Sequence, residues 1–120
     1  MAIATINPAT GETLKSFDEL TDQELQARIA RASEAFGSYR RTAIDDRVRW
    51  CRAAADVLDQ DADWVAEMMT TEMGKTLASA KAEVAKCARL LRYTAEHGPG
   101  FMQTEPADAR AVGAREAYVE

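Results

Sequence analysis

Apolar residues recur at helical spacing over most of this chain, and that periodicity limits the folds it can adopt. Between residues 21 and 98 the apolar positions follow intervals of three and four, with breaks near Gly37, between Asp59 and Asp63, and at Gly74. Such intervals place apolar side chains on one face of an α-helix. The sequence therefore predicts four amphipathic helices in succession, spanning about residues 21–98.

The first of these helices has a well-marked beginning. Thr21 and Glu24 stand at the two positions of a capping box, and Leu20 and Leu25 flank them where a hydrophobic staple forms. Gly37 is expected to end this helix, because glycine is common just past a helix C-terminus. The expected apolar face comprises Leu25, Ile29, Ala32 and Phe36.

Similar signals bound the other three helices. Thr42 is expected to begin the second, Gly74 to close the third, and Thr76 to cap the fourth. Proline cannot continue a helix, so Gly98-Pro99-Gly100 should stop the fourth. The apolar positions are Ile44, Val48, Cys51, Ala55 and Leu58 in the second helix, Trp64, Val65, Met68, Met69 and Met73 in the third, and Leu77, Ala80, Val84, Cys87, Leu91 and Ala95 in the fourth.

The two ends of the chain have β character. Residues 2–18 are predicted to form a hairpin, with Pro8 and Gly11 in a turn between two β-prone runs. Residues 101–120 are expected to be a polar, irregular loop from Gln103 through Gly113, followed by the start of an unpaired strand at Ala117. The predicted fold class is mainly α with a short N-terminal hairpin, a partial α/β fold without a parallel sheet.

Composition restricts the core and the possible partners. Apolar residues make up 47% of the chain, but many are alanine and only 7% of residues are aromatic, so the core should be thin. The net charge of −5 comes without a basic patch, which argues against a nucleic-acid partner. No run approaches the ~20 apolar residues that cross a membrane, and the N-terminus is not a signal peptide. We therefore expect a cytoplasmic protein with reduced, buried thiols at Cys51 and Cys87.

The residues that could carry chemistry do not assemble into a site in the sequence. His97 is the single histidine, and a surface or helix-capping role is expected for it. Cys51 and Cys87 both fall on apolar helix faces, where cysteine packs as a small hydrophobe rather than acting as a nucleophile. The Met68, Met69 and Met73 group could be a partner surface but is expected in the core.

Two motifs that suggest ligand binding are incomplete. Gly74-Lys75-Thr76 lacks the upstream glycine and the preceding strand of a phosphate-binding loop. Asp59, Asp61 and Asp63 alternate like metal ligands but lack the glycine and glutamate of a calcium loop. The sequence thus predicts no catalytic, cofactor-binding or metal-binding residue.

Three segments taken in order resemble the N-terminal part of aldehyde dehydrogenases. They are INPATGETL from Ile6, the run TTEMGKTLASAKAEVAKCARLLRYTAEH from Thr70 to His97, and the tail ARAVGAREAYVE. The second is most similar to the NAD(P)-dependent succinate-semialdehyde dehydrogenase branch. The resemblance covers essentially the whole chain but only about the first quarter of a typical member. Many members differ at Ser79, where they have glutamate, and at Gly98-Pro99-Gly100, where their helix continues.

The resemblance implies an NAD(P)-dependent oxidation of an aldehyde, succinate semialdehyde, to the acid. In the family a cysteine nucleophile, an oxyanion-binding asparagine and a glutamate base all lie downstream of Glu120, so no catalytic residue can be carried over. Residues 1–120 are then expected to be an inactive N-terminal fragment whose partner is the rest of the fold or a second copy. The alternative is a free-standing helical interaction module without enzymatic activity. A clean stop after Glu120 would favour that alternative.

Overall fold

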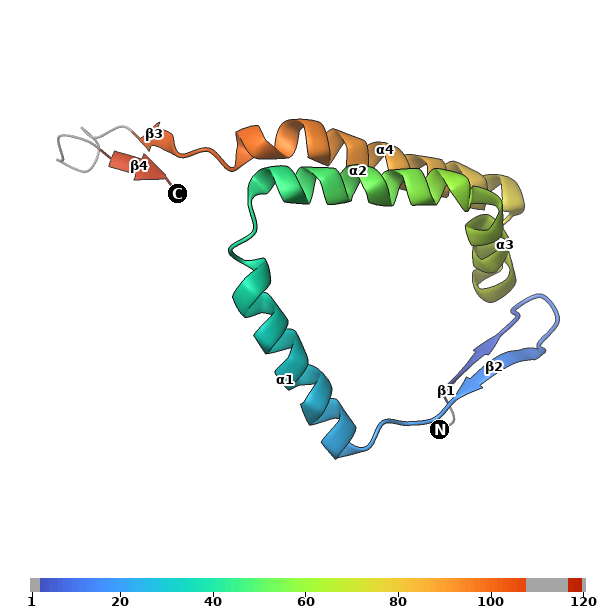
Figure 1. Cartoon of the computed structure of the whole chain (residues 1–120). Coiled ribbons are helices and arrows are strands. Elements are labelled where there is room, and N and C mark those ends of the chain that lie inside the picture. Colours follow the sequence, from blue (N-terminus) through green and yellow to red (C-terminus); the bar gives the residue numbers. More distant parts are fainter. Residues whose placement is uncertain (1–2, 108–116, 120) are drawn as a thin grey trace.

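The computed structural model describes residues 3–107 and 117–119, and within them it confirms the predicted fold class. An antiparallel hairpin is followed by four helices (Figure 1). The elements are β1 (Ile3–Ile6), β2 (Thr13–Phe17), α1 (Asp22–Tyr39), α2 (Ile44–Gln60), α3 (Ala62–Met73), α4 (Leu77–Phe101), β3 (Glu105–Ala107) and β4 (Ala117–Val119).

The N-terminal hairpin is held by its turn as well as by its strands. β1 pairs antiparallel with β2, from Ile3 opposite Phe17 to Ile6 opposite Thr13. In the turn the side-chain oxygen of Asn7 accepts a hydrogen bond from the Ala9 amide at 2.9 Å. Gly11 has a φ of 74°, the left-handed conformation that glycine adopts without steric cost. The predicted role of the turn residues is confirmed.

Helix α1 begins as predicted and ends later than predicted. The Glu24 amide donates to Thr21 Oγ1 at 3.2 Å, and the Thr21 amide donates to Glu24 Oε2 at 2.9 Å, which completes the capping box. Gly37 does not end the helix, because α1 continues to Tyr39 and Gly37 stays out of the left-handed conformation. A glycine inside a helix costs only about 1 kcal/mol, which is too little to stop a helix that is otherwise favourable.

The start of α2 also differs from the prediction. Thr42 is not the capping residue: its hydroxyl donates to the Tyr39 carbonyl at 2.8 Å, and α2 begins at Ile44 after an uncapped Ala43. A single non-helical residue, Asp61, separates α2 from α3. Gly74 closes α3 as predicted, with a φ of 70°.

Helix α4 has the predicted start but passes the predicted stop. The Ser79 amide donates to Thr76 Oγ1 at 3.3 Å, which confirms the cap. The helix then includes Pro99 and ends at Phe101. Pro99 has no amide to donate to the carbonyl four residues before it, so one hydrogen bond of the last turn is missing, but the Met102 amide still reaches the Gly98 carbonyl at 3.1 Å. The helix therefore continues through the segment at which it was predicted to stop.

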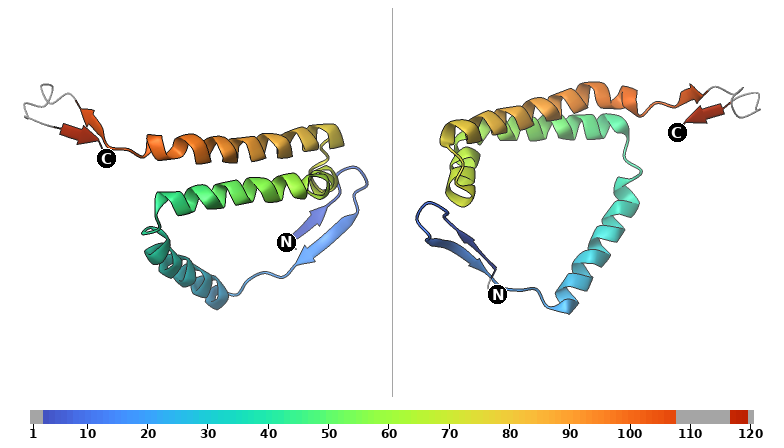
Figure 2. Two further views of the ribbon diagram at one scale, coloured as in Figure 1. Left: turned by 45° about the horizontal axis from the view of Figure 1, so that its top comes forward. Right: turned by 180° about the vertical axis from the view of Figure 1, so that it is seen from behind.

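The core lies where α4 packs along α2 and, at its N-terminal end, against α3 (Figure 2). Every fully buried residue described is small or medium-sized, so the predicted thin core is confirmed. These residues are Ala55, Ala66, Ala80, Val84, Ala88 and Ala95. Leu58, Ala62, Val65 and Met69 pack around the part of the core formed by Ala66, Ala80 and Val84.

Several residues predicted to be buried are not. Cys87 is exposed and Cys51 is only half-buried. Trp64 is 64% exposed and Met73 is 68% exposed. The buried stripe of α4 runs through Ala80, Val84, Ala88 and Ala95, at intervals of four, four and seven, and Cys87 lies outside it. Alanine lets the helix axes come close together, so larger side chains at the edges remain outside the contact.

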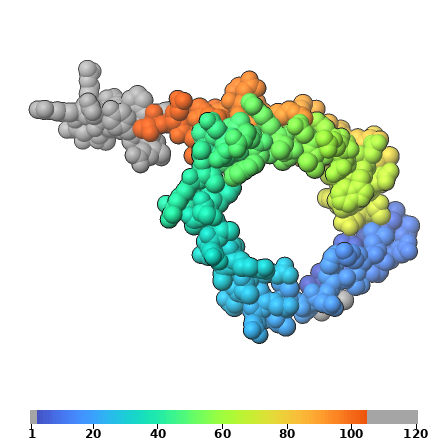
Figure 3. All heavy atoms as spheres, viewed as in Figure 1, coloured from blue at the N-terminus to red at the C-terminus, as the bar shows by residue number. Residues whose placement is uncertain are grey.

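Helix α1 lies apart from this core and buries none of its residues. Leu25, Ile29 and Phe36, its predicted apolar face, are 46%, 53% and 60% exposed. The elements α1, α2, α3 and the N-terminal hairpin together form a ring. Figure 3 shows that its centre is empty. The amphipathic pattern of α1 is real, but no described element covers its apolar face.

The C-terminal segment is more regular than the sequence suggested. The strand that begins at Ala117 is not unpaired, because β4 pairs antiparallel with β3, Ala117 opposite Ala107 and Val119 opposite Glu105. Backbone amides and carbonyls require partners, and the two short strands supply them to each other. The rest of the predicted loop, up to Gly113, and Glu120 lie outside the described residues.

Candidate functional site

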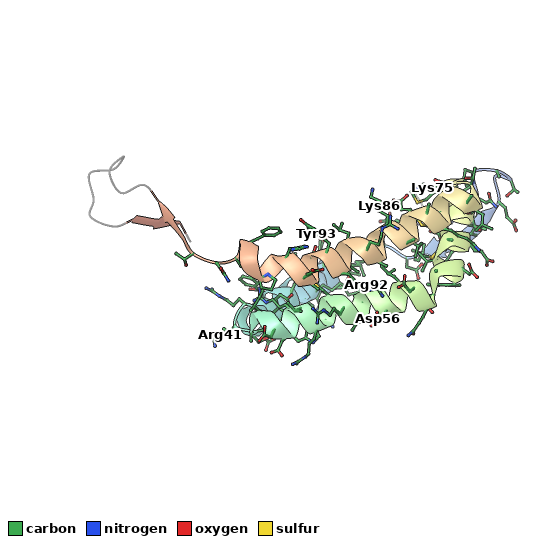
Figure 4. All side chains as sticks on the ribbon, turned by 90° about the horizontal axis from the view of Figure 1, so that it is seen from above. Arg41, Asp56, Lys75, Lys86, Arg92 and Tyr93 are labelled. Atoms are coloured by element: carbon green, nitrogen blue, oxygen red, sulfur yellow. The ribbon has the colours of Figure 1, made fainter. Side chains whose placement is uncertain are left out.

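Charged residues along the edge of the helical layer bind the helices to one another. Arg92 of α4 contacts Asp56 and Asp59 of α2, each at 2.7 Å. Figure 4 shows Arg92 and Asp56 between the two helices, whereas Tyr93 lies on the other edge of α4. The hydrogen bonds with Asp56 and Asp59 raise the pKa of Arg92 above its usual value. This cluster therefore fixes how α2 lies along α4.

A similar pair joins α4 to α3. Lys81 Nζ lies 2.7 Å from Asp63 Oδ1. The hydrogen bond with Asp63 raises the pKa of Lys81, and the negative charge of that carboxylate raises it further. Of the alternating aspartates that resembled metal ligands, Asp59 and Asp63 are thus both partners of cations on α4. Among the described residues, no group of three His, Cys, Asp or Glu side chains is placed to hold a metal ion.

An apolar hollow of the described surface lies where α1 turns into α2 and meets the end of α4. It has a volume of about 380 Å³, and its wall includes Tyr39, Val48, Cys51, Pro99, Phe101 and Met102. Four of its lining residues carry polar or reactive groups: the guanidinium of Arg47, the thiol of Cys51, and the hydroxyls of Tyr39 and Thr94.

The guanidinium of Arg47 makes its hydrogen bonds to residues at the corner between α1 and α2. Its Nε donates to Thr42 Oγ1 at 2.9 Å, and its Nη2 donates to the carbonyls of Tyr39 at 3.1 Å and Arg40 at 3.2 Å. Its Cζ lies 4.9 Å from the centre of the Tyr39 ring, in cation–π geometry. Arg47 therefore closes this corner of the chain. This role was not predicted from the sequence, where Thr42 was expected to begin the second helix and nothing marks Arg47 as its partner.

The two cysteines and the histidine are not brought together. Cys51 faces the apolar hollow, and Cys87 lies on the exposed surface of α4. His97 is an exposed residue of α4, with its ring 4.3 Å from that of Tyr93 and 6.4 Å from that of Phe101. Because α4 runs to Phe101, His97 is a surface residue inside the helix and not its C-cap.

The polar groups of the Gly74-Lys75-Thr76 motif have partners within the chain. At the start of α4, Lys75 is paired with Glu83 and the Thr76 hydroxyl is taken by the Ser79 amide. Gly98 and Gly100 lie within α4 and not in a loop that could approach a phosphate. In the described part of the chain, no helix is both long and apolar enough to cross a membrane.

The geometry does not show which protein family the chain belongs to, but a comparison with protein families does. A profile described as the aldehyde dehydrogenase family matches residues 1–118. The chain belongs to this family. The resemblance inferred from the two turn motifs and the α4 sequence is thereby confirmed.

Curated relatives identify the branch of aldehyde dehydrogenases to which the chain is similar. It is 57% identical over 118 residues to the succinate-semialdehyde dehydrogenase [NADP(+)] 1 of Mycobacterium tuberculosis, covering 98% of this chain and 26% of that protein. It is 51% identical over 117 residues to the succinate-semialdehyde dehydrogenase [NADP(+)] of Mycobacterium leprae, covering 98% of this chain and 26% of that protein. The chain thus spans about a quarter of the length of these relatives.

A solved structure agrees with this placement. The crystal structure of succinic semialdehyde dehydrogenase from Streptococcus pyogenes, in complex with NADP+, aligns with a TM-score of 0.86 and 33% identity. The alignment covers 98% of this aldehyde dehydrogenase chain and 25% of that protein. The arrangement of hairpin and helices is therefore the arrangement that this family uses.

Proposed function

We propose that this aldehyde dehydrogenase chain is part of an NADP-dependent enzyme that oxidises succinate semialdehyde to the carboxylic acid. The observation that carries the proposal is the 57% identity to the enzyme of Mycobacterium tuberculosis over 98% of the chain. The cofactor is inferred from that relative and from the NADP+ complex of the Streptococcus pyogenes enzyme. Within this proposal the described residues supply scaffold and no catalytic group. The free thiols of Cys51 and Cys87 suit the cytoplasm.

The exposed surface supports a scaffold role. The chain exposes 9906 Å², whereas a compact monomer of 13.2 kDa should expose about 6,400 Å². An excess of about 3,500 Å² on one side corresponds to about 7,000 Å² for both partners together, which is beyond a standard interface and in the open-ended upper range of obligate ones. The radius of gyration is 21.3 Å, against about 14 Å for a compact domain of this length. This chain carries surface suited to a large, permanent contact.

The apolar face of α1 indicates where part of that contact would lie. The face is formed by Leu25, Ile29 and Phe36, and all three are about half exposed. Fully burying one such side chain contributes about 1.5–3 kcal/mol. An element that covers this face of α1 would therefore be bound strongly. In the proposed enzyme the remainder of the aldehyde dehydrogenase fold covers it. In the isolated chain a second copy could take that place.

A chimeric enzyme tests the proposal. The matching segment of the Mycobacterium tuberculosis enzyme is replaced by this chain, and NADP reduction with succinate semialdehyde is measured. We expect the chimera to be active, and the same enzyme without the segment to be inactive. A chimera that assembles but does not turn over succinate semialdehyde with NADP or NAD would contradict the proposed activity.

The isolated chain supplies the complementary experiment. It is expected to show no reduction of NADP with succinate semialdehyde and no saturable NADP binding by calorimetry, because the described residues offer neither a paired nucleophile nor a dinucleotide site. Turnover by the purified chain would refute this assignment of roles. A stand-alone interaction module would instead melt sharply as a monomer and fail to support activity in the chimera.

A further inference from the structure

The turn of the N-terminal hairpin meets the corner between α3 and α4 at a single close approach. Gly74, at that corner, has a φ of 70°. A Cβ placed on it would lie 2.9 Å from Pro8 Cγ and 3.6 Å from Pro8 Cβ. Carbon atoms in favourable contact lie about 3.5–4.0 Å apart. Two independent reasons therefore favour glycine at position 74: its left-handed backbone conformation, and the space that the Pro8 ring needs.

The hairpin turn presents Pro8 in a defined position. The Asn7 amide donates to the Glu12 carbonyl at 2.9 Å, and the Gly11 amide donates to the Asn7 carbonyl at 2.8 Å. The Ala9 amide donates to the Asn7 side chain at 2.9 Å. The proline ring also fixes its own φ. Hydrogen bonds within the hairpin turn, and the Gly74 amide bond to the Thr70 carbonyl at the α3–α4 corner, hold each segment in its own conformation. Pro8 and Gly74 therefore meet without rearrangement of either segment.

Little else holds the hairpin against the helices. Among the described residues, neither strand shares an extended contact surface with a helix. Leu14 of β2 and Trp64 and Met68 of α3 border a hollow of about 300 Å³ instead of packing flush. On its other side the hairpin is joined to α1 only by the link from Asp18 to Thr21. The position of the hairpin therefore depends on the contact at its turn.

We propose that Pro8 and Gly74 form a latch that docks the N-terminal hairpin on the α3–α4 corner and closes the ring seen in Figure 3. The two turn motifs, far apart in the sequence, act as one structural unit. With the latch released, the hairpin moves about the link that precedes α1. The latch does not depend on the proposed enzymatic activity, so its test and the chimera test can fail independently.

A spin label on the hairpin reports docking. Ala9→Cys, in a chain with Cys51→Ser and Cys87→Ser, carries the label at the turn, and amide signals of residues 72–77 are followed by NMR. Docking broadens those signals. Gly74→Ala should lower the ratio of docked to undocked hairpin by roughly tenfold, because the added methyl group overpacks the contact with Pro8. Tenfold corresponds to about 1.4 kcal/mol. Far-ultraviolet dichroism should show the same helix content.

Three matched variants separate the contact from backbone strain. Gly74→Asn adds a Cβ but tolerates a positive φ, so it should undock the hairpin as Gly74→Ala does. Gly37→Ala adds a methyl group that meets nothing within 4 Å, so docking should not change. Combining Pro8→Ala with Gly74→Ala removes Cγ and leaves the approach of 3.6 Å. The double variant should therefore be more docked than Gly74→Ala alone.

Several results would overturn the latch. One is that the parent chain shows no broadening at residues 72–77. Another is that Gly74→Ala and Gly74→Asn leave the broadening unchanged. A third is that the double variant is no more docked than Gly74→Ala alone. If Gly74→Ala loses helix content, Pro8→Ala alone decides the matter, because it leaves the α3–α4 corner unchanged. Weaker broadening in Pro8→Ala supports the latch, and unchanged broadening refutes it.

Discussion

Replacing Arg47 by alanine should open the corner between α1 and α2. The side chain of Arg47 makes three hydrogen bonds across this corner, to the Thr42 hydroxyl and to the carbonyls of Tyr39 and Arg40. It also covers the Tyr39 ring. Because α1 buries none of its residues, nothing else described in the structure sets its direction as directly.

The magnitude follows from these contacts. Each hydrogen bond contributes about 1 kcal/mol net, and a cation–π contact near the surface adds about 0.5–1 kcal/mol. Arg47 is only half-buried, so water replaces part of what is lost. We expect Arg47→Ala to cost about 2–3 kcal/mol in the free energy of opening this corner.

Tryptophan fluorescence during urea unfolding is a suitable assay. The Trp50 ring stacks on Tyr39 with ring centres 5.9 Å apart. In a Trp64→Phe background, where Trp50 is the single tryptophan, its emission therefore reports the state of the corner. Far-ultraviolet dichroism follows all helices in the same samples. Arg47→Ala should shift the Trp50 transition to lower urea, and Arg47→Lys should shift it part of the way, because lysine keeps the charge but lacks the planar fork of donors.

Arg49→Ala is the matched control. It removes the same charge from the same helix, but the Arg49 side chain is 72% exposed and bonds only to Asp46, at 2.5 Å. An exposed pair of this kind contributes about 0.5 kcal/mol or less. If the Trp50 transition of Arg47→Ala coincides with that of Arg49→Ala, the clamp assigned to Arg47 is wrong.

The remaining predictions concern α1 and the exposed apolar faces. Thr21→Ala should cost about 1 kcal/mol of stability, and an unchanged unfolding midpoint would show that the cap does not hold α1. The hydrogen bond from the Thr21 amide, followed by that from its hydroxyl, lowers the pKa of Glu24 from 4.5. The stability from this carboxylate is therefore present above pH 4.5 and is lost as the pH falls further, through the lowered value. Amide exchange in α1 against pH should show this loss, and Glu24→Gln should abolish it. The chain should also be rich in helix yet bind a hydrophobic dye or self-associate, and a sharply melting monomer without dye binding would contradict this.

Local signals in the sequence were sufficient where one residue determines a helix end. Thr21 with Glu24, Gly74 and Thr76 cap or close their helices as predicted, because each satisfies backbone groups within a few residues of itself. The same reasoning failed at Thr42 and Pro99. The Thr42 hydroxyl instead accepts a hydrogen bond from Arg47. Pro99 removes one i→i−4 hydrogen bond without ending α4, which continues to Phe101.

The prediction that no catalytic group lies in this chain was based on residue types and on the family resemblance. Nothing in the structure tests it directly, and it stays a prediction for the isolated-chain assay. The structure adds where the candidates lie: Cys51 beside the apolar hollow, Cys87 on the surface, and His97 between two aromatic rings. Sequence spacing could not give this, because it fixes neither the rotation of a helix nor its neighbours.

The sequence by itself determined the succession of one hairpin and four helices and a thin core rich in alanine, since these depend on local propensity and composition. The family followed separately, from the resemblance of whole segments to aldehyde dehydrogenases, which the family profile confirmed. Only the tertiary structure decided which stripe of each helix is buried, that α1 stands apart, that β4 pairs with β3, and that Pro8 meets Gly74. These features depend on contacts between residues far apart in the chain. Such contacts are set by the close approach of whole elements, which no local pattern encodes.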